Sequence, residues 1–153
     1  MPNIIINPKF RKFINKQRIL NSINAVIDAY NPERPQDLTI KISDDLEIQE
    51  LNKVYRGIDS PTDVLSFNND HLDLDNGNYY LGDVIISYPT AEEQAREAGC
   101  DISDEIELLV VHGCLHLFGY DHLVLTEKHV MWQIQRSILS NLGNPIAFEK
   151  DFK

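Results

Sequence analysis

The sequence lacks the features that mark membrane and secreted proteins. No apolar run among its 153 residues approaches the roughly 20 residues that a membrane-spanning helix needs. The opening residues, MPNIIIN, have too short an apolar core and no leading positive charge, so we expect no signal peptide and no membrane contact. The two cysteines, Cys100 and Cys114, indicate no disulfide framework, and we expect Cys114 to be a buried thiol. These absences favour a cytoplasmic protein.

Internal repeats, low-complexity segments and Gly/Ser/Pro-rich linkers are also missing from the chain. Hydrophobic residues make up 42% and charged residues 25%, which is typical of soluble globular proteins. We therefore predict that residues 1–153 form a single domain.

Positive charge is scarce but concentrated at one end. The first eighteen residues carry no acid and five bases, a local charge of +5, so that with a net charge of −10 the remainder sums to −15. The five bases are Lys9, Arg11, Lys12, Lys16 and Arg18. They form either an ordinary solvated surface or a basic face on an otherwise acidic protein.

Hydrophobic patterning predicts an α/β (α+β) fold with four strands and about five helices. Short apolar or alternating runs predict strands at 3–7, 38–43, 64–67 and 83–87. Helical spacing and capping residues predict helices at 17–30, 44–55, 90–98, 101–118 and 126–142, and the polar stretch 68–78 reads as a loop. Helical crossovers imply parallel pairing of the early strands, and the direct link between the last two permits antiparallel pairing. We expect a mixed four-stranded sheet with the helix 101–118 most buried.

Three of the five histidines fall in the motif HGCLHLFGYDH, residues 112–122. His112 and His116 are four residues apart, so on a helix their side chains lie on one face. Gly119 is suited to end that helix in a left-handed conformation and to reverse the chain, which would bring His122 to the same point. Three imidazoles bind zinc and leave its fourth position open. The spacing predicts a catalytic site for one zinc ion at the end of a buried helix, although nickel, copper and iron also suit imidazole.

The same spacing occurs in the zinc-peptidase signature HExxHxxGxxH, whose glutamate is the general base. Here Gly113 occupies that position and cannot transfer a proton. The other histidines, His71 and His129, are expected to be surface residues without a role.

The motif closely resembles the signature of the YbeY family of bacterial endoribonucleases, the rRNA maturation factors. The resemblance extends to LNKVYRG at 51–57, PTDVLSF at 61–67 and LGDVI at 81–85, whereas Asn68 departs from the proline that the family often has there. It implies a metal-dependent hydrolase that cleaves single-stranded RNA in ribosomal RNA processing, notably at the 3′ end of small-subunit rRNA, and in ribosome quality control. It also implies contact with the ribosome or ribosomal proteins.

By the same resemblance, His112, His116 and His122 would be the zinc ligands, and Arg56 would match the arginine that the family needs for activity. Zinc lowers the pKa of bound water to about 7 or polarises a phosphoryl oxygen, and a guanidinium fits the negative oxygens of a cleaving phosphodiester. Arg56 is otherwise a surface cation at a helix C-terminus. Ser66 either lines the cleft or satisfies backbone groups. Two alternatives stay open: a zinc-containing ribosome-associated binding factor, and a zinc hydrolase of another substrate.

Overall fold

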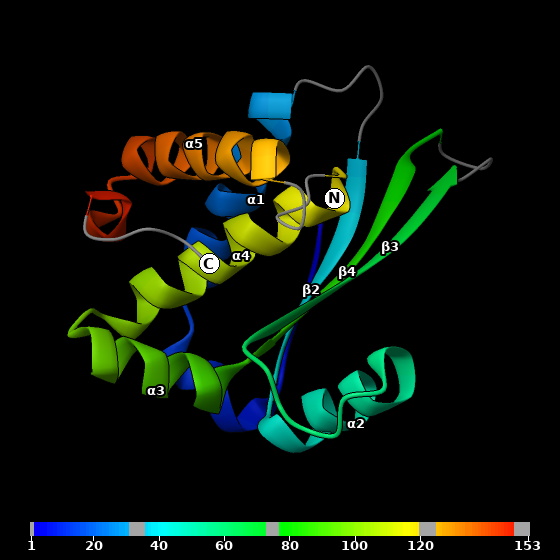
Figure 1. Cartoon of the computed structure of the whole chain (residues 1–153), viewed down its shortest axis with the longest axis vertical. Coiled ribbons are helices and arrows are strands. Elements are labelled where there is room, and N and C mark those ends of the chain that lie inside the picture. The colour runs from blue at the N-terminus through cyan, green and yellow to red at the C-terminus, as the bar shows by residue number, and fades with distance from the viewer. Residues whose placement is uncertain (1, 31–35, 73–76, 120–124, 149–153) are drawn as a thin grey trace.

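The computed structural model of the protein describes residues 2–30, 36–72, 77–119 and 125–148, which contain a four-stranded mixed sheet (Figure 1). The strands are β1 (Asn3–Ile6), β2 (Gln36–Ser43), β3 (Val64–Leu72) and β4 (Tyr79–Ser87). They run in the order β1-β2-β4-β3, with β1, β2 and β4 parallel and β3 antiparallel to β4. The predicted mixed sheet and its pairing are confirmed. β3 forms one edge.

The described parts of the chain also contain five α-helices and two short 3-10 helices. They are η1 (Pro8–Phe13), α1 (Lys16–Tyr30), α2 (Asp45–Arg56), α3 (Tyr88–Ala98), α4 (Ile102–Leu117), α5 (Leu125–Asn141) and η2 (Pro145–Phe148). Figure 1 shows α1, α4 and α5 stacked on one side of the sheet, with α2 apart from them. No helix within the described residues is both long and apolar enough to cross a membrane.

The alternation of side chains along the strands separates two packing layers. Leu38, Ile40 and Ile42 of β2 are buried in the main core with α1 and α4. On the opposite face, Ile48 of α2 forms a smaller cluster with Leu65 and Ile85, which are cross-strand partners in β3 and β4. α4 therefore lies in the middle of the main core, and α2 covers part of the other face.

α4 is the most buried helix that the structure describes, as predicted, with eleven of its sixteen residues buried. Cys114 lies on it with no exposed surface, and burial raises the pKa of its thiol to about 12. The folded state therefore contains almost no Cys114 thiolate at pH 8, and the thiolate is the reactive form.

We expect a thiol reagent at pH 8 to modify only Cys100 in the native protein and to reach Cys114 only on unfolding. Cys100 is partly exposed and provides the internal comparison. The measurement is the number of thiols that react with an aromatic disulfide reagent with and without denaturant. A Cys100→Ser variant should show no fast reaction, and rapid modification of two thiols in native wild type would contradict this burial.

The prediction of a loop at 68–78 is wrong for residues 68–72, because β3 continues through them to Leu72. Asn68 pairs with Gly82 and His71 with Tyr80, across a register irregularity between the two pairs. Backbone pairing with β4 places these residues in the sheet. Polar residues are common on edge strands, so their polarity alone predicted the wrong structure. His71 thus lies in a strand.

The start of α3 also differs from the prediction. The residue that caps it is Ser87, whose hydroxyl oxygen accepts from the N–H of Thr90 at 3.3 Å, and Pro89 sits in the first turn. The Thr90 hydroxyl instead donates to Asp45 of α2 at 2.6 Å. The helix therefore begins directly at the end of β4, two residues before the predicted start.

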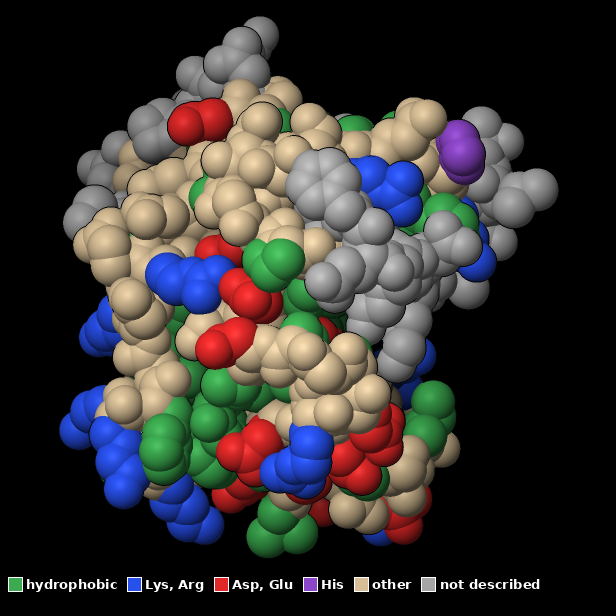
Figure 2. Space-filling model, turned by 90° about the vertical axis from the view of Figure 1, so that its left-hand side faces the viewer, with side chains coloured by type: hydrophobic (Ala, Val, Ile, Leu, Met, Phe, Trp, Pro, Cys, Tyr) green, Lys and Arg blue, Asp and Glu red, His purple; other side chains and the backbone are tan. Residues whose placement is uncertain are grey.

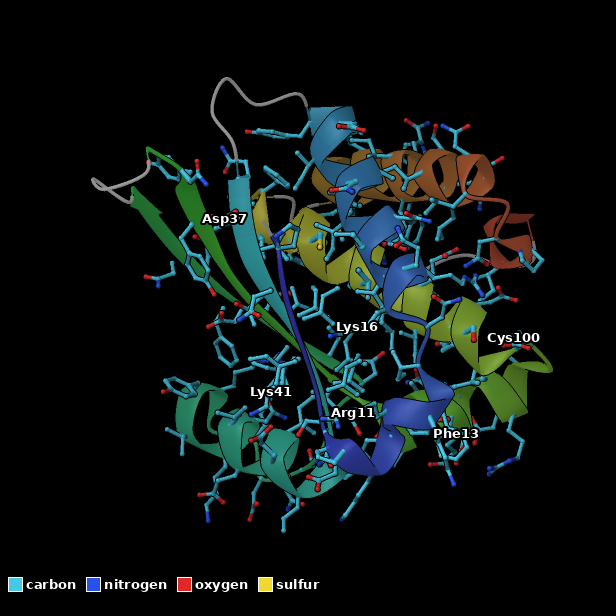
Figure 3. All side chains as sticks on the ribbon, turned by 180° about the vertical axis from the view of Figure 1, so that it is seen from behind. Arg11, Phe13, Lys16, Asp37, Lys41 and Cys100 are labelled. Carbon is cyan, nitrogen blue, oxygen red and sulfur yellow. The ribbon has the colours of Figure 1, made fainter. Side chains whose placement is uncertain are left out.

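The five bases of the N-terminal segment divide into two groups. Four of them lie on η1 or at the start of α1, and Figure 3 shows Arg11 and Lys16 among them. Figure 2 shows Lys and Arg side chains gathered at the lower left of one face. Arg18 instead donates to Asp104 at 2.9 Å and to the buried Glu107 at 3.1 Å, which ties α1 to α4. Because Arg18 is paired with these two carboxylates, at most the other four bases contribute to a basic face.

Candidate metal centre

The helix that carries the histidines has well-defined ends. At the start, the Asp101 carboxylate accepts from the N–H of Ser103 at 2.8 Å, and Asp104 and Glu105 complement the positive end of the helix. At the other end, Gly119 has φ 94°, and its N–H donates to the carbonyl of His116 at 3.0 Å. The predicted left-handed glycine directly after the motif helix is confirmed.

α4 brings His112 and His116 together. Their Nε2 atoms are 3.1 Å apart, and the ring centroids lie 4.7 Å apart at an interplanar angle of 75°. Two nitrogens bound to one tetrahedral zinc at about 2.0–2.1 Å each lie about 3.3 Å from one another. The observed separation is close to that value, so these two side chains fit the role of ligands to a common ion.

His122 lies outside the described residues, and its role as third ligand stays a prediction. Within the residues that the structure describes, no group of three His, Cys, Asp or Glu side chains is placed to hold a metal. His129 is exposed on α5, as expected of a surface residue.

Gln135 is a member of the site that the sequence analysis missed. It lies on α5, is only 1% exposed, and its Oε1 is 2.9 Å from Nδ1 of His112. The residues one turn away on the same side of α5, Met131 and Ile138, belong to the main core. The sequence does show a polar residue, Gln135, between apolar residues of one helix face. That pattern does not reveal that Gln135 contacts His112.

Gly113 is required by packing and not only by the absence of a peptidase base. A Cβ added there would lie 2.5 Å from Cγ1 of Val84 and 3.3 Å from Oγ of Ser66. Real Cβ atoms essentially never approach another atom as closely as 2.5 Å. Because α4 touches the sheet at this residue, a glutamate could not occupy the position without displacing Val84 or the helix.

Strand β3 holds the histidine helix through two side chains. The Ser66 hydroxyl donates to the Gly113 carbonyl at 3.1 Å, and Nδ2 of Asn68 donates to the Leu117 carbonyl at 2.9 Å. The Leu117 carbonyl is among the last four of α4, which lack partners within the helix. Ser66 thus forms a hydrogen bond with a helix carbonyl. Asn68 holds the last turn of α4, although this residue departs from the proline of the family motif.

Arg56 lies on the other side of the sheet from the histidines. It is the last residue of α2 and is exposed, followed by Gly57 at φ 70°. The preceding residue, Tyr55, packs its ring edge-on against Phe67 of β3 at 5.2 Å. Phe67 is the residue between Ser66 and Asn68, so the end of α2 and the histidine helix contact the same stretch of the edge strand from opposite faces.

A pocket of about 300 Å³ opens beside the C-terminal turn of α4. The residues that line it include Tyr30, Tyr79, Phe118 and Asn68. Tyr30 and Phe118 stack with their centroids 4.2 Å apart. Aromatic and amide groups therefore lie next to the helix end that carries His116.

The fold matches a protein of known structure. A solution structure of TM1509 from Thermotoga maritima superposes with a TM-score of 0.60 at 24% sequence identity, covering 99% of this chain and 97% of the other. The likeness shows that the two proteins share this α+β fold.

Sequence comparison then identifies the family. The family model described as Endoribonuclease YbeY matches residues 5–143, and the chain belongs to the YbeY family. A protein of Aquifex aeolicus named Endoribonuclease YbeY is 46% identical over 145 residues, which are 94% of this chain and 93% of that protein. The protein of the same name from Persephonella marina is 38% identical over 144 residues, 93% of this chain and 94% of its own length.

Proposed function

We propose that this protein is a metal-dependent endoribonuclease that cleaves single-stranded RNA in ribosomal RNA processing, including 3′-end maturation of small-subunit rRNA, and in ribosome quality control. The proposal places it in the cytoplasm, in contact with the ribosome or ribosomal proteins. The observation that carries it is the facing pair of Nε2 atoms of His112 and His116 at 3.1 Å. Family membership names RNA as the substrate.

The metal would be held by His112 and His116, with His122 as the predicted third ligand. When bound, zinc supplies Lewis acidity, which stabilises the negative charge that phosphodiester cleavage builds. The donor set is compatible because imidazole is a preferred ligand of zinc, and the two described rings already point their nitrogens at one locus. The capped start of α4 and Gly119 at its end define the backbone that carries both rings.

Arg56 is proposed to bind the phosphate that is cleaved. A guanidinium stays protonated at any physiological pH and forms two parallel hydrogen bonds with phosphate oxygens. Tyr55 places the end of α2 against Phe67, beside the two β3 residues that anchor α4. An RNA strand that crosses the β3 edge at residues 66–68 would therefore meet Arg56 on one side and the histidines on the other.

The pocket beside Asn68 supports a preference for single strands. Proteins read unpaired RNA by stacking its bases on aromatic rings and by hydrogen bonds from polar side chains. Tyr79 and Phe118 supply aromatic rings next to the histidine helix. A base held in a duplex cannot enter a pocket of this kind.

We expect Arg56→Ala to lower the rate of RNA cleavage by about 100-fold or more, the usual effect of removing a group that stabilises transition-state charge. Zinc content and unfolding temperature should stay at wild-type values, since the Arg56 side chain is exposed. The measurement is cleavage of a single-stranded RNA with elemental analysis of the same samples.

Lys53→Ala is the matched control, because Lys53 is another exposed cation in the last turn of α2. It should cleave at nearly the wild-type rate, and Arg56→Lys should recover part of the activity. Equal activity of wild type and Arg56→Ala would remove Arg56 from the mechanism. RNA degradation that separates from purified wild type on a column would overturn the enzyme proposal itself.

A further inference from the structure

We propose that Gln135 is a positioning residue of the metal centre, which holds the His112 proton on Nδ1 so that Nε2 keeps its lone pair for the metal. The inference rests on the metal centre of the proposed function. Gln135 lies 23 residues beyond His112, on a different helix, and reaches it only through the packing of α5 on α4.

The hydrogen bond determines which imidazole nitrogen is protonated. A neutral imidazole has one N–H donor and one acceptor nitrogen, and the partner of one nitrogen decides the state of the other. The carbonyl oxygen of Gln135, 2.9 Å from Nδ1, can only accept, so the proton belongs on Nδ1. Nε2 of His112 then faces Nε2 of His116 as a lone pair, in the state that a metal ligand needs.

The surroundings of Gln135 give no structural reason for a polar side chain. Its neighbours on the buried side of α5, Met131, Ile138 and Leu139, are at most 4% exposed. Its own Nε2 is buried and has no hydrogen-bond partner among the described residues. An unpaired buried donor opposes folding, so an apolar side chain of equal length would suit the core better. The contact with His112 is what the amide supplies.

The same helix, α5, contains a second glutamine–histidine contact that lies on the exposed surface. Nε2 of Gln133 lies 3.3 Å from Nε2 of His129, and both residues are exposed. A substitution at Gln133 therefore removes another Gln–His contact of α5, one made by the amide nitrogen, without touching the proposed metal centre.

The test compares wild type, Gln135→Met, Gln135→Glu and Gln133→Met. Zinc affinity is measured by competition with a chromophoric chelator, and the unfolding temperature is measured without metal. We expect Gln135→Met to bind zinc 10- to 100-fold more weakly, the usual effect of losing a ligand's hydrogen-bond partner. Its metal-free unfolding temperature should equal or exceed that of wild type. Gln135→Glu, which keeps an acceptor oxygen, should restore zinc binding, and Gln133→Met should match wild type.

Nitrogen NMR of the metal-free protein supplies a readout independent of zinc. The His112 ring should carry its proton on Nδ1 in wild type and lose that preference in Gln135→Met. A wild-type His112 protonated on Nε2, or unchanged zinc affinity in Gln135→Met, would overturn the role of Gln135. If wild type binds no zinc, the proposal of a metal centre is wrong. The protonation of the His112 ring then still decides whether Gln135 positions His112.

Discussion

Replacing His116 with alanine is expected to lower the zinc affinity of the protein by more than about 100-fold, because a lost ligand costs more than a lost partner of a ligand. The substitution removes one of the two Nε2 atoms that face each other at 3.1 Å. RNA cleavage should fall to background in the same variant. The measurements are metal content after purification without added zinc and cleavage of a single-stranded RNA.

His129→Ala is the matched control, because His129 is an exposed histidine on α5 for which we propose no role. It should keep both zinc and activity. Since a ligand that binds only the folded state stabilises it, added zinc should raise the unfolding temperature of wild type and His129→Ala but not of His116→Ala. Wild-type zinc affinity in His116→Ala would show that the ion, if bound, is held elsewhere.

The two alternatives predict different combinations of these results. A ribosome-associated factor with structural zinc would lose stability in His116→Ala, while no RNA cleavage would be present to lose. A hydrolase of another substrate would lose activity toward that substrate, which a panel of peptides and small phosphodiesters would identify.

Replacing Gly113 with alanine is expected to destabilise the protein by about 1–2 kcal/mol, within the usual range for overpacking a core. The added Cβ would lie 2.5 Å from Cγ1 of Val84, which is fully buried and β-branched and so has few other rotamers. Alanine is favoured over glycine inside a helix by about 1 kcal/mol, which offsets part of the clash. The measurement is the free energy of unfolding in urea.

The clash can be tested by a double-mutant cycle. Val84→Ala removes the two methyl groups nearest the added Cβ, so Gly113→Ala should cost less in that background than in wild type. Additive effects of the two substitutions, or a Gly113→Ala variant more stable than wild type, would contradict the packing described for Gly113.

Gly113→Glu would complete the peptidase motif in sequence, yet its side chain has no room against Val84 and Ser66. We expect an unfolded or insoluble protein without peptidase activity. The residue after His112 is small because the helix packs directly on the sheet.

Local patterns in the sequence determined most of the secondary structure and the pairing of the strands. Apolar periodicity placed the four strands and five helices, since burial on one face leaves a repeat in the chain. It failed where backbone pairing decided the outcome, because polarity hid the extension of β3 to Leu72. The start of α3 was also predicted two residues late, because Ser87 at the end of β4 caps this helix.

The sequence by itself also determined the histidine pair, because a spacing of four residues places His112 and His116 on one helix face wherever that helix packs. Only the tertiary structure decided what surrounds them. Gln135 reaches His112 from another helix, and Val84 limits residue 113 to glycine. Tyr55, the neighbour of Arg56, packs on Phe67 of β3 from the far side of the sheet. Each of these contacts joins residues of two different elements, and periodicity predicts that a side chain is buried but not which partner it contacts.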